Sequence, residues 1–419
     1  MSLTRREAFQ MGLCFAGTLT AQGFLSPAHS TEKVGLSGSF ALQRDAEIAW
    51  RYFTSTASGT ELGIVPAATW PEGDSYGRYN ILTMWDMGSL ILAYISARSI
   101  GIISEKEFDQ RIKSIMSYLR RSEFRFGNLT LPNFRTGTTA GRTVESGYDA
   151  TDTGRVLIAL HILDQVTNGA YGVKQQVARW NLAGTVVNGR LQDIKSGSRY
   201  DSKCFNYVHY IALAYKVWGI EVATGFDRPL VEGDADARTA FLAHVASIGP
   251  IASEPSVTEA IELGHSVHSR ILTDVLYEAQ KERYAETGHL TCVSESPIDA
   301  KPWFTYQGYN VDAEAGPRWP VDAVITDSRW RTNDFAHAFR MISSKAAYLW
   351  FAERGDDYAE KLHDFVLAKA PSARHGFTPG VYETSGRAPR LMDVNTNAAV
   401  LESLAFIHNG RKPLVQIRL

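Results

Sequence analysis

The chain has 419 residues, with 43 basic and 45 acidic side chains and a formal net charge of −2. This balance argues against a protein that binds nucleic acid through a basic surface. The length allows either two or three average domains or one large helical domain. Aromatic residues are frequent, with 9 Trp, 18 Tyr and 19 Phe, and many stand beside Gly, Pro and Asn in expected loops. Loop aromatics suit stacking against sugar rings, although most aromatic side chains are core.

Residues 1–30 are expected to form an export signal. Paired arginines precede a moderately apolar run over 11–25, and Ala28-His29-Ser30 offers small residues at the spacing of a cleavage site. The pattern resembles a twin-arginine signal, which predicts a periplasmic or secreted protein. No later segment approaches 18 continuous apolar residues, so we expect no stable membrane insertion.

Residues 31–41 are expected to be a linker, and 42–419 a single domain built mainly of helices. Apolar periodicity and capping residues predict helices over 42–56, 85–97, 104–121, 149–168, 175–182, 205–218, 256–263, 268–287, 334–354, 357–370 and 396–408. Long loops rich in Gly, Pro and aromatics are expected over 58–79, 123–147, 224–236, 297–309 and 376–387. Strand-type alternation is nowhere long enough for a major sheet, although short strands are expected.

The helices alternate between short turns and long loops, in hairpins of roughly 50 to 60 residues. This rhythm predicts an all-α fold, an (α/α)6 toroid of helical hairpins whose long loops gather on one rim. Function commonly sits on loops that a rigid scaffold holds in place.

The stretch Glu145–Leu160 combines three acids with the start of a helix. Asp149 and Asp152 are three residues apart in the expected first turn, so both face one side of the helix. Carboxylates at this position cap the unpaired N–H groups of the helix end. The alternative is that they belong to the floor of a sugar-binding cleft, and the stretch by itself does not decide between the two roles.

Several loop motifs together resemble the bacterial family called "domain of unknown function 3131". They are Trp85-Asp86-Met87-Gly88-Ser89, Thr151-Asp152-Thr153-Gly154-Arg155, Glu295-Ser296-Pro297, the run from Lys301 to Tyr309, Gly376-Phe377, Tyr382-Glu383, and Asn395-Thr396-Asn397 leading to Val400-Leu401-Glu402. That family is similar to (α/α)6 glycoside hydrolases that cleave β-1,2-glucan. The resemblance implies the toroid and a groove that faces a bacterial glucan or exopolysaccharide.

Inverting glycoside hydrolysis requires one protonated carboxylic acid and a second carboxylate that activates water. We expect Glu295 to be the acid, because the aromatic cluster that follows it would raise its pKa by desolvation. We expect Asp152 or Asp149 to be the base, because a helix N-terminus favours the ionised form. For each residue a purely structural role is the alternative.

Further residues of the same loops are candidates for substrate binding. They are Trp85, Asp86, Arg155, Trp303, Phe304, Tyr306, Tyr309, Tyr382 and Glu383. The aromatic members are expected to stack on sugar rings, and the polar members to bind hydroxyl groups. Asp86 as a helix cap, and Arg155 or Arg387 as structural ion-pair partners, are the alternatives.

Two other function classes fit parts of the sequence. A polysaccharide lyase would use Asn206 to neutralise a uronate and His209 or Tyr207 to move protons, although these residues also fit a helical core stripe. A periplasmic glycan-binding or scaffold protein would need the aromatics but no paired acids. Cys204 and Cys292 are expected to be separate buried thiols, with pairing as the alternative. The sequence indicates no metal site and no cofactor, and it leaves the oligomeric state open.

Overall fold

Helices provide most of the regular structure of the chain. The computed structural model describes residues 36–57, 62–139, 141–322, 330 and 332–417, so the expected export signal lies outside the described residues. From Phe40 onward the chain forms one compact unit. The helices are α2 (Leu36–Ser55), α3 (Met84–Ser99), α4 (Glu105–Arg121), α5 (Ala150–Val166), α6 (Val173–Arg179), α7 (Val208–Lys216), α8 (Ala235–Ile248), α9 (Ser253–Glu262), α10 (Val267–Thr287), α11 (Asn333–Phe339), α12 (Ser344–Glu353), α13 (Asp357–Lys369) and α14 (Val394–His408).

Short strands and 3-10 turns fill the connections between these helices. The strands are β1 (Ala68–Thr69), β2 (Arg78–Tyr79), β3 (Ile81–Leu82), β4 (Glu123–Phe126), β5 (Leu129–Pro132), β6 (Arg135–Gly137), β7 (Thr143–Glu145), β8 (Gly147–Tyr148), β9 (Val186–Val187), β10 (Arg190–Lys195), β11 (Ser198–Asp201), β12 (Ser296–Pro297), β13 (Phe304–Gln307), β14 (Val321–Asp322), β15 (Met341–Ser343), β16 (Pro371–Ser372), β17 (Gly376–Phe377), β18 (Gly380–Tyr382) and β19 (Met392–Asp393). The 3-10 turns are η1 (Leu182–Thr185), η2 (Phe205–Tyr207) and η3 (Ala313–Ala315).

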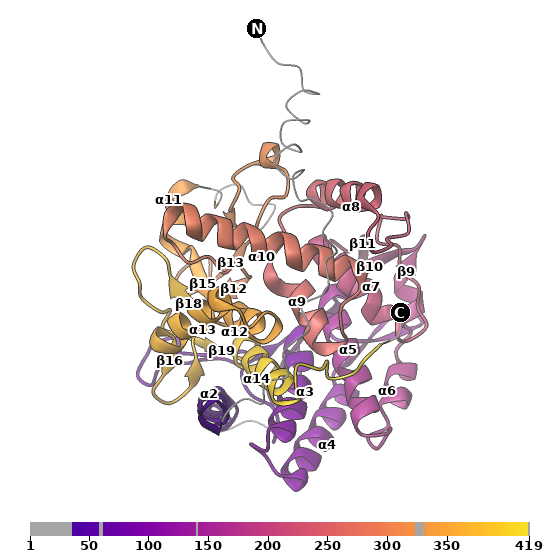
Figure 1. Cartoon of the computed structure of the whole chain (residues 1–419). Helices are drawn as coiled ribbons and strands as arrows, with labels where there is room; N and C mark the ends of the chain where they lie inside the picture. The colour runs from indigo at the N-terminus through magenta and orange to yellow at the C-terminus, as the bar shows by residue number, and fades with distance from the viewer. Residues whose placement is uncertain (1–35, 58–61, 140, 323–329, 331, 418–419) are drawn as a thin grey trace. The chain divides into compact units, whose positions relative to one another are not determined.

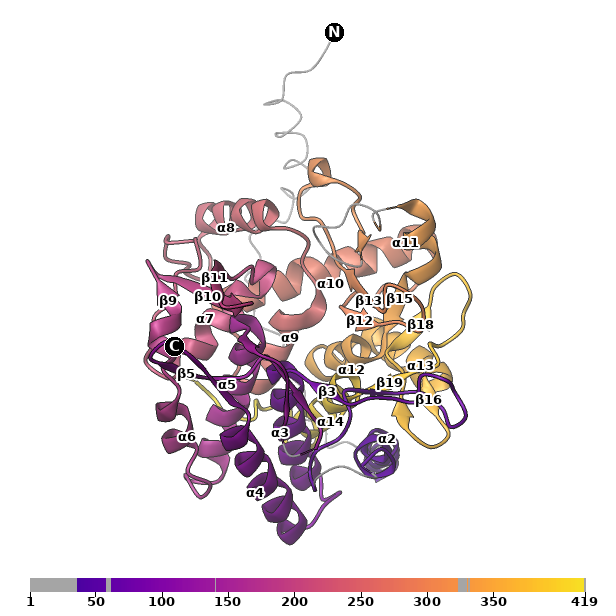
Figure 2. The ribbon, with the colours of Figure 1, turned by 180° about the vertical axis from the view of Figure 1, so that it is seen from behind.

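Six helices pack on one another in a series that returns to its first member. Helix α3 packs on α5, α5 on α7, α7 on α9, α9 on α12, α12 on α14, and α14 packs back on α3. Figures 1 and 2 show α3, α12 and α14 side by side from opposite directions. The remaining contacts add a second helix to several of these six: α4 packs on α3, α6 on α5, α10 on α9 and α13 on α12.

Helices α3 and α4 show how composition separates an inner helix from an outer one. Nearly all of α3 is buried, from Met84 to Ala97, as expected for a helix that is apolar on every side. Helix α4 is amphipathic instead, with a buried stripe that includes Phe108, Ile112 and Ile115. It begins at the N-cap Ser104, whose side chain accepts a hydrogen bond from the N–H of Glu107, and it carries acids in its first turn.

The small sheets hold the loops at fixed positions. In the sheet β12-β13-β14 the strands are antiparallel, and Ser296 lies opposite Thr305 while Tyr306 lies opposite Asp322. Glu295 therefore stands immediately before a short edge strand whose partner carries the aromatic run that begins at Trp303. The expected loop over 297–309 is in this way partly a strand.

The structure differs from the sequence-based prediction in three other segments. The expected helix over 334–354 is broken, because Met341–Ser343 pairs with β18 and the Ser343 side chain caps a new helix by accepting from the N–H of Ala346. Helix α8 (Ala235–Ile248) follows the expected loop over 224–236 and was not predicted. Helix α2 begins at Leu36, so the second half of the expected linker over 31–41 is helical.

Candidate active-site cleft

A cleft of about 1780 Å³ lies where several helices begin. Its walls include the N-terminal ends of α3, α5, α9 and α14 and the segment before α7. Within the described residues, the carboxylates that line it are Asp86, Asp149, Asp152, Asp193, Asp201, Glu254, Glu295, Asp322 and Asp393. Helix N-termini carry unpaired N–H groups and a partial positive charge, so their convergence favours acidic side chains at this place.

Asp86 is both a helix cap and a wall of the cleft. Its carboxylate accepts hydrogen bonds from the N–H and the hydroxyl of Thr83, which accepts in return from the N–H of Asp86, so the two form a full capping box. Asn395 at the start of α14 donates to the second oxygen at 2.9 Å. Burial raises the pKa of Asp86 to about 6, against these hydrogen bonds, which lower it.

Asp149 and Asp152 take different roles at the start of α5. Asp149 is the N-cap and accepts hydrogen bonds at 3.0 Å from the N–H groups of Thr151 and Asp152. Its other oxygen lies 3.6 Å from Nζ of Lys195. The Asp152 side chain does not cap the helix and is partly exposed in the cleft.

The pKa of Asp152 is raised well above its usual range. Burial is the main cause, and the charges of Asp149, Asp86 and Glu295 add to it. We expected the helix N-terminus to keep this carboxylate ionised. Desolvation and three neighbouring acids oppose that effect, so Asp152 holds its proton more tightly than an ordinary aspartate.

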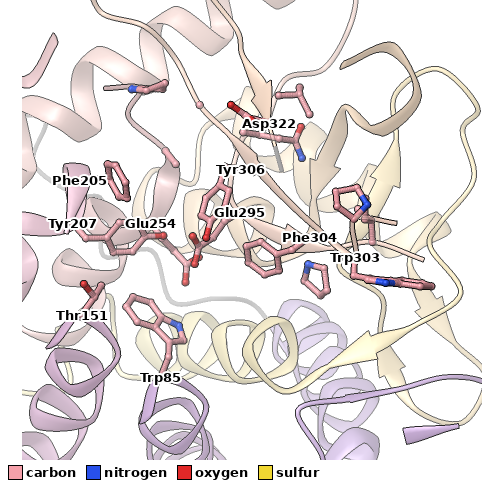
Figure 3. Close-up of a pocket in the computed structure, with 18 of the residues that line it drawn as sticks. Trp85, Thr151, Phe205, Tyr207, Glu254, Glu295, Trp303, Phe304, Tyr306 and Asp322 are labelled. Atoms are coloured by element: carbon pink, nitrogen blue, oxygen red, sulfur yellow. The ribbon is translucent and has the colours of Figure 1, made fainter. Parts of the chain in front are cut away.

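Glu295 lines the same cleft as Asp152, and the charges of the two carboxylates interact. Figure 3 shows it beside Glu254 and Tyr306, with Tyr207 and Trp85 nearby. Burial raises the pKa of Glu295 to about 7, while the Lys345 ammonium lowers it and the Glu254 charge raises it. A carboxylic acid with this pKa keeps a substantial protonated fraction at neutral pH, as a general acid requires.

Lys345 and Glu254 form a buried ion pair next to Glu295, and neither residue was predicted from the sequence to belong to the site. Nζ of Lys345 contacts Oε2 of Glu254, and the hydroxyl of Ser294 donates to the same oxygen at 3.2 Å. Both side chains are almost completely buried. One signal was available in the sequence: Lys345 stands directly before the apolar run that begins at Ala346, where a buried lysine needs an acidic partner.

Aromatic side chains line the cleft on both sides of the acids. They are Trp70, Tyr76, Tyr79, Trp85, Tyr200, Phe205, Tyr207, Trp303, Phe304, Tyr306 and Trp319. In Figure 3, Phe205 and Tyr207 lie on one side of Glu295, while Phe304 and then Trp303 lie on the other. Trp85, Trp303, Phe304 and Tyr306 were expected from the sequence to contact substrate, and all four belong to this lining.

With this geometry established, the comparisons with known proteins identify the family. A family profile described as "Protein of unknown function (DUF3131)" matches residues 44–410. The chain belongs to this family. No curated protein matches this DUF3131 chain.

Solved structures resemble the DUF3131 chain in fold. An endo-β-1,2-glucanase from Chitinophaga pinensis, in complex with sophorotriose and glucose, superposes with a TM-score of 0.61 at 13% identity, over 89% of this chain and 93% of that one. A candidate glucoamylase from Bacteroides caccae gives 0.59 at 13% identity, over 89% and 94%. An endo-β-1,2-glucanase from Talaromyces funiculosus with sophorose gives 0.57 at 11% identity, over 89% and 85%. At these identities the likeness shows the fold and does not assign a reaction.

Arg155 does not face the cleft, which corrects its expected role in substrate binding. Its guanidinium is buried among the inner helices, where Nη1 donates to Tyr210 at 2.7 Å and to Glu262, and Nη2 donates to Glu402 at 3.0 Å. These contacts engage both terminal nitrogens of the guanidinium within the protein. Arg155 is therefore a structural ion-pair partner.

Three more candidates of this DUF3131 protein are not part of the cleft lining and make structural contacts instead. Tyr309 packs its ring on Trp319, with ring centroids 4.8 Å apart. The Tyr382 hydroxyl donates to Asp299 at 2.9 Å, and Arg387 binds the same carboxylate at 2.6 Å. The Glu383 carboxylate accepts two hydrogen bonds from Arg283, at 2.8 and 2.9 Å. Gly308 and Asn310, the neighbours of Tyr309, line the cleft, but none of the three candidates does.

Of the residues that a lyase would use, Asn206 and Tyr207 line the cleft and His209 does not. Asn206 donates to the backbone oxygens of Gly249 and Pro250, the latter at 2.8 Å, so its amide is already used. His209 stacks on His268 with ring centroids 4.6 Å apart and does not line the cleft. Burial lowers the pKa of His209 to about 3.

The two cysteines of the described region are free and buried, as the sequence favoured. The described residues contain no group of three or more side chains placed to hold a metal ion. None of the helices in the described ranges has the length and apolar composition needed to cross a membrane.

Proposed function

We propose that the chain is a glycoside hydrolase that cleaves a bacterial glucan with inversion at the anomeric carbon. The observation that carries the proposal is the pair of cleft carboxylates, Glu295 and Asp152, which interact electrostatically across an aromatic-lined cleft and both have raised pKa values. Paired acids in such a cleft are the chemical requirement of glycoside hydrolysis.

Glu295 is the general acid in this mechanism. It donates its proton to the glycosidic oxygen as the bond between that oxygen and the anomeric carbon breaks. Tyr207 and Tyr306 lie beside Glu295, and the charge of Lys345 limits the rise of its pKa. Glu295 therefore keeps its proton near neutral pH and can still donate it to the glycosidic oxygen.

Asp152 is the general base, which takes a proton from the water that attacks the anomeric carbon. Its side chain opens into the cleft, whereas Asp149 is engaged by two backbone N–H groups and Lys195. The Glu295 charge is one of the causes that raise the pKa of Asp152. When Glu295 keeps its proton that repulsion disappears, so the protonated acid and the ionised base favour each other.

The inner helices support an (α/α)6 toroid as the scaffold of this site. Their successive contacts return from α14 to α3, and four of the six begin with residues that line the cleft. The solved glucanases of similar fold bind β-1,2-linked glucosides, so we propose linear β-1,2-glucan as the first substrate to test. The twin-arginine-like start of the sequence supports a periplasmic place of action, with an exopolysaccharide as the wider substrate class.

The experiment is an assay of the protein without residues 1–30 on linear β-1,2-glucan and on a panel of other bacterial glycans. We expect new reducing ends from at least one glycan, and NMR of the first product should show the inverted anomer. Glu295→Gln should lower turnover by about 100- to 10,000-fold with an unchanged fold. The matched control is Glu145→Gln, an exposed glutamate outside the cleft lining that should keep full turnover.

Three outcomes would contradict the proposal in different ways. Unchanged turnover in Glu295→Gln would remove Glu295 from the role of acid. A product that absorbs near the ultraviolet edge would indicate elimination, and hence a lyase. Binding without turnover on every glycan would indicate a glycan-binding or scaffold protein.

A further inference from the structure

Three aromatic side chains from two separate loops form a cluster at one end of the cleft. The rings of Trp70 and Tyr76 have centroids 5.6 Å apart, and those of Tyr76 and Trp303 are 5.0 Å apart. All three residues line the cleft, and Tyr76 is half exposed. We call these three residues the aromatic platform. A cluster of aromatic rings that stays partly exposed is typical of a ligand-binding groove, whereas a single exposed ring is not.

An ion bridge fixes the two loops of the platform to each other. Asp74, in the turn between Trp70 and Tyr76, lies 3.1 Å from the Arg390 guanidinium. The backbone N–H of Arg390 donates at 3.0 Å to Asp299, which belongs to the loop before Trp303. Both aspartate side chains are more than nine-tenths buried. The Arg390 side chain that joins them is 59% exposed, so the bridge holds the loops less firmly than a fully buried ion pair would.

The backbone at Trp303 has the left-handed conformation, with φ of +75°. This conformation is unfavourable for a bulky residue that is not glycine. Two backbone hydrogen bonds hold it, from Trp303 N–H to Ala300 at 2.7 Å and from Ile298 N–H to the Trp303 carbonyl at 3.0 Å. Such strained positions cluster at ligand sites, and here the strain accompanies a ring placed against Tyr76.

The platform is separated from the reacting acids along the cleft. Glu295 precedes Ser296, which pairs with Thr305, so Glu295 stands near Tyr306 at the opposite end of the short strand from Trp303. Three residues of a strand span about 10 Å, which is more than one sugar ring covers. Figure 3 shows the same order, with Phe304 between Glu295 and Trp303.

We propose that the aromatic platform is a distal sugar-binding subsite, which stacks on a pyranose ring of the glycan away from the bond that is cleaved. The inference rests on the proposed function, because it takes the ligand to be the same uncharged glycan chain. It adds that affinity depends on chain length. Only an oligosaccharide long enough to reach from Glu295 to Trp303 gains the stacking energy.

The test uses Glu295→Gln as a binding-competent protein that does not turn substrate over. Calorimetry would measure its affinity for a β-1,2-linked glucose disaccharide and for the hexasaccharide. Adding Trp303→Ala should weaken hexasaccharide binding roughly tenfold, because loss of an aromatic anchor has about this effect. Disaccharide binding should change less than about twofold, since a short ligand at the acids does not reach the platform.

Two further variants separate the platform from a general effect on folding. Arg390→Ala keeps all three rings and the backbone hydrogen bond to Asp299 but removes the ion pair with Asp74, so it should weaken hexasaccharide binding in the same direction and to a smaller extent. Tyr171→Ala removes an aromatic ring outside the cleft lining and should change neither affinity. Circular dichroism and thermal melting would confirm that each variant is folded.

The outcomes distinguish this inference from the proposed function. Equal weakening of both ligands by Trp303→Ala, or no weakening of either, would overturn the platform alone. Failure of Glu295→Gln to bind either oligosaccharide, together with no turnover by the unmodified protein, would overturn both proposals.

Discussion

Two clusters of acidic residues lie in the same part of the fold and have opposite surroundings. Around Arg155, Glu262 and Glu402 are fully buried, and each contacts the guanidinium. In the cleft, Asp152 and Glu295 are partly exposed, and the described structure gives neither of them a direct ion pair. The Arg155 cluster links helices α5, α9 and α14. Asp152 and Glu295 lie in the cleft, where these three helices begin.

The comparison shows how surroundings decide what a carboxylate does. A buried acid with a fixed cationic partner is held in one state and contributes to a specific packing arrangement. An acid that is desolvated but not paired has a raised pKa and is available for proton transfer. The positive ends of several helices converge on the cleft and offset part of the cost of keeping such acids there.

The largest effect is expected from neutralising one cleft acid. Asp152→Asn should lower turnover about 100- to 10,000-fold, as loss of a general base does. Asp149→Asn is the matched control, since it makes the same change three residues earlier and asparagine still caps a helix. Steady-state kinetics on the substrate found in the glycan panel would measure both. If Asp149→Asn proves the more damaging, the two roles must be exchanged.

Breaking the other cluster should affect stability and not chemistry. Arg155→Met leaves Glu262 and Glu402 buried without their cation, which should lower the free energy of unfolding by roughly 3–5 kcal/mol. Urea denaturation would measure it. Lys113→Met removes an exposed lysine that pairs with Asp109 at 2.8 Å and should cost roughly 0–1 kcal/mol. Equal losses in the free energy of unfolding from Arg155→Met and Lys113→Met would contradict the difference between the buried and the exposed ion pairs.

Glu295→Gln should stabilise the fold at alkaline pH. The pKa of Glu295 is raised from 4.5 to about 7 in the folded protein, so the proton stabilises the fold below pH 4.5 and this contribution is lost as pH rises through 7. Glutamine resembles the protonated acid at every pH. We therefore expect its free energy of unfolding at pH 8 to exceed that of the unmodified protein by on the order of 2 kcal/mol. The gain should vanish near pH 4, and a gain independent of pH would argue against the raised pKa.

The smallest effect concerns the buried ion pair behind the acid. The Glu254 charge raises the pKa of Glu295, so Glu254→Gln should move the alkaline limb of kcat/KM to lower pH, by less than about one unit. The pH dependence of kcat/KM would show this shift. A limb that stays in place, or moves to higher pH, would separate Glu254 from the protonation of Glu295.

Local rules predicted much of the framework and part of the site. The apolar periodicity around Trp85 and the acids at the start of α5 indicated helix starts, and Asp86 and Asp149 are caps because their partners lie two or three residues away. The same rules failed where a segment pairs with a strand that is distant in the sequence. Met341–Ser343 is a strand because it pairs with β18, and no local sequence pattern predicted this.

The sequence by itself determined which segments are helical and which short acidic and aromatic motifs stand at helix starts, because capping and periodicity act over a few residues. Only the tertiary structure decided which of those motifs face the cleft. Arg155 follows Asp152 by three positions, yet its partners Glu262 and Glu402 are 107 and 247 residues away and draw it into the core. Glu295 meets Asp152 and Lys345 only through packing of distant helices, and that packing sets the pKa on which the proposed chemistry depends.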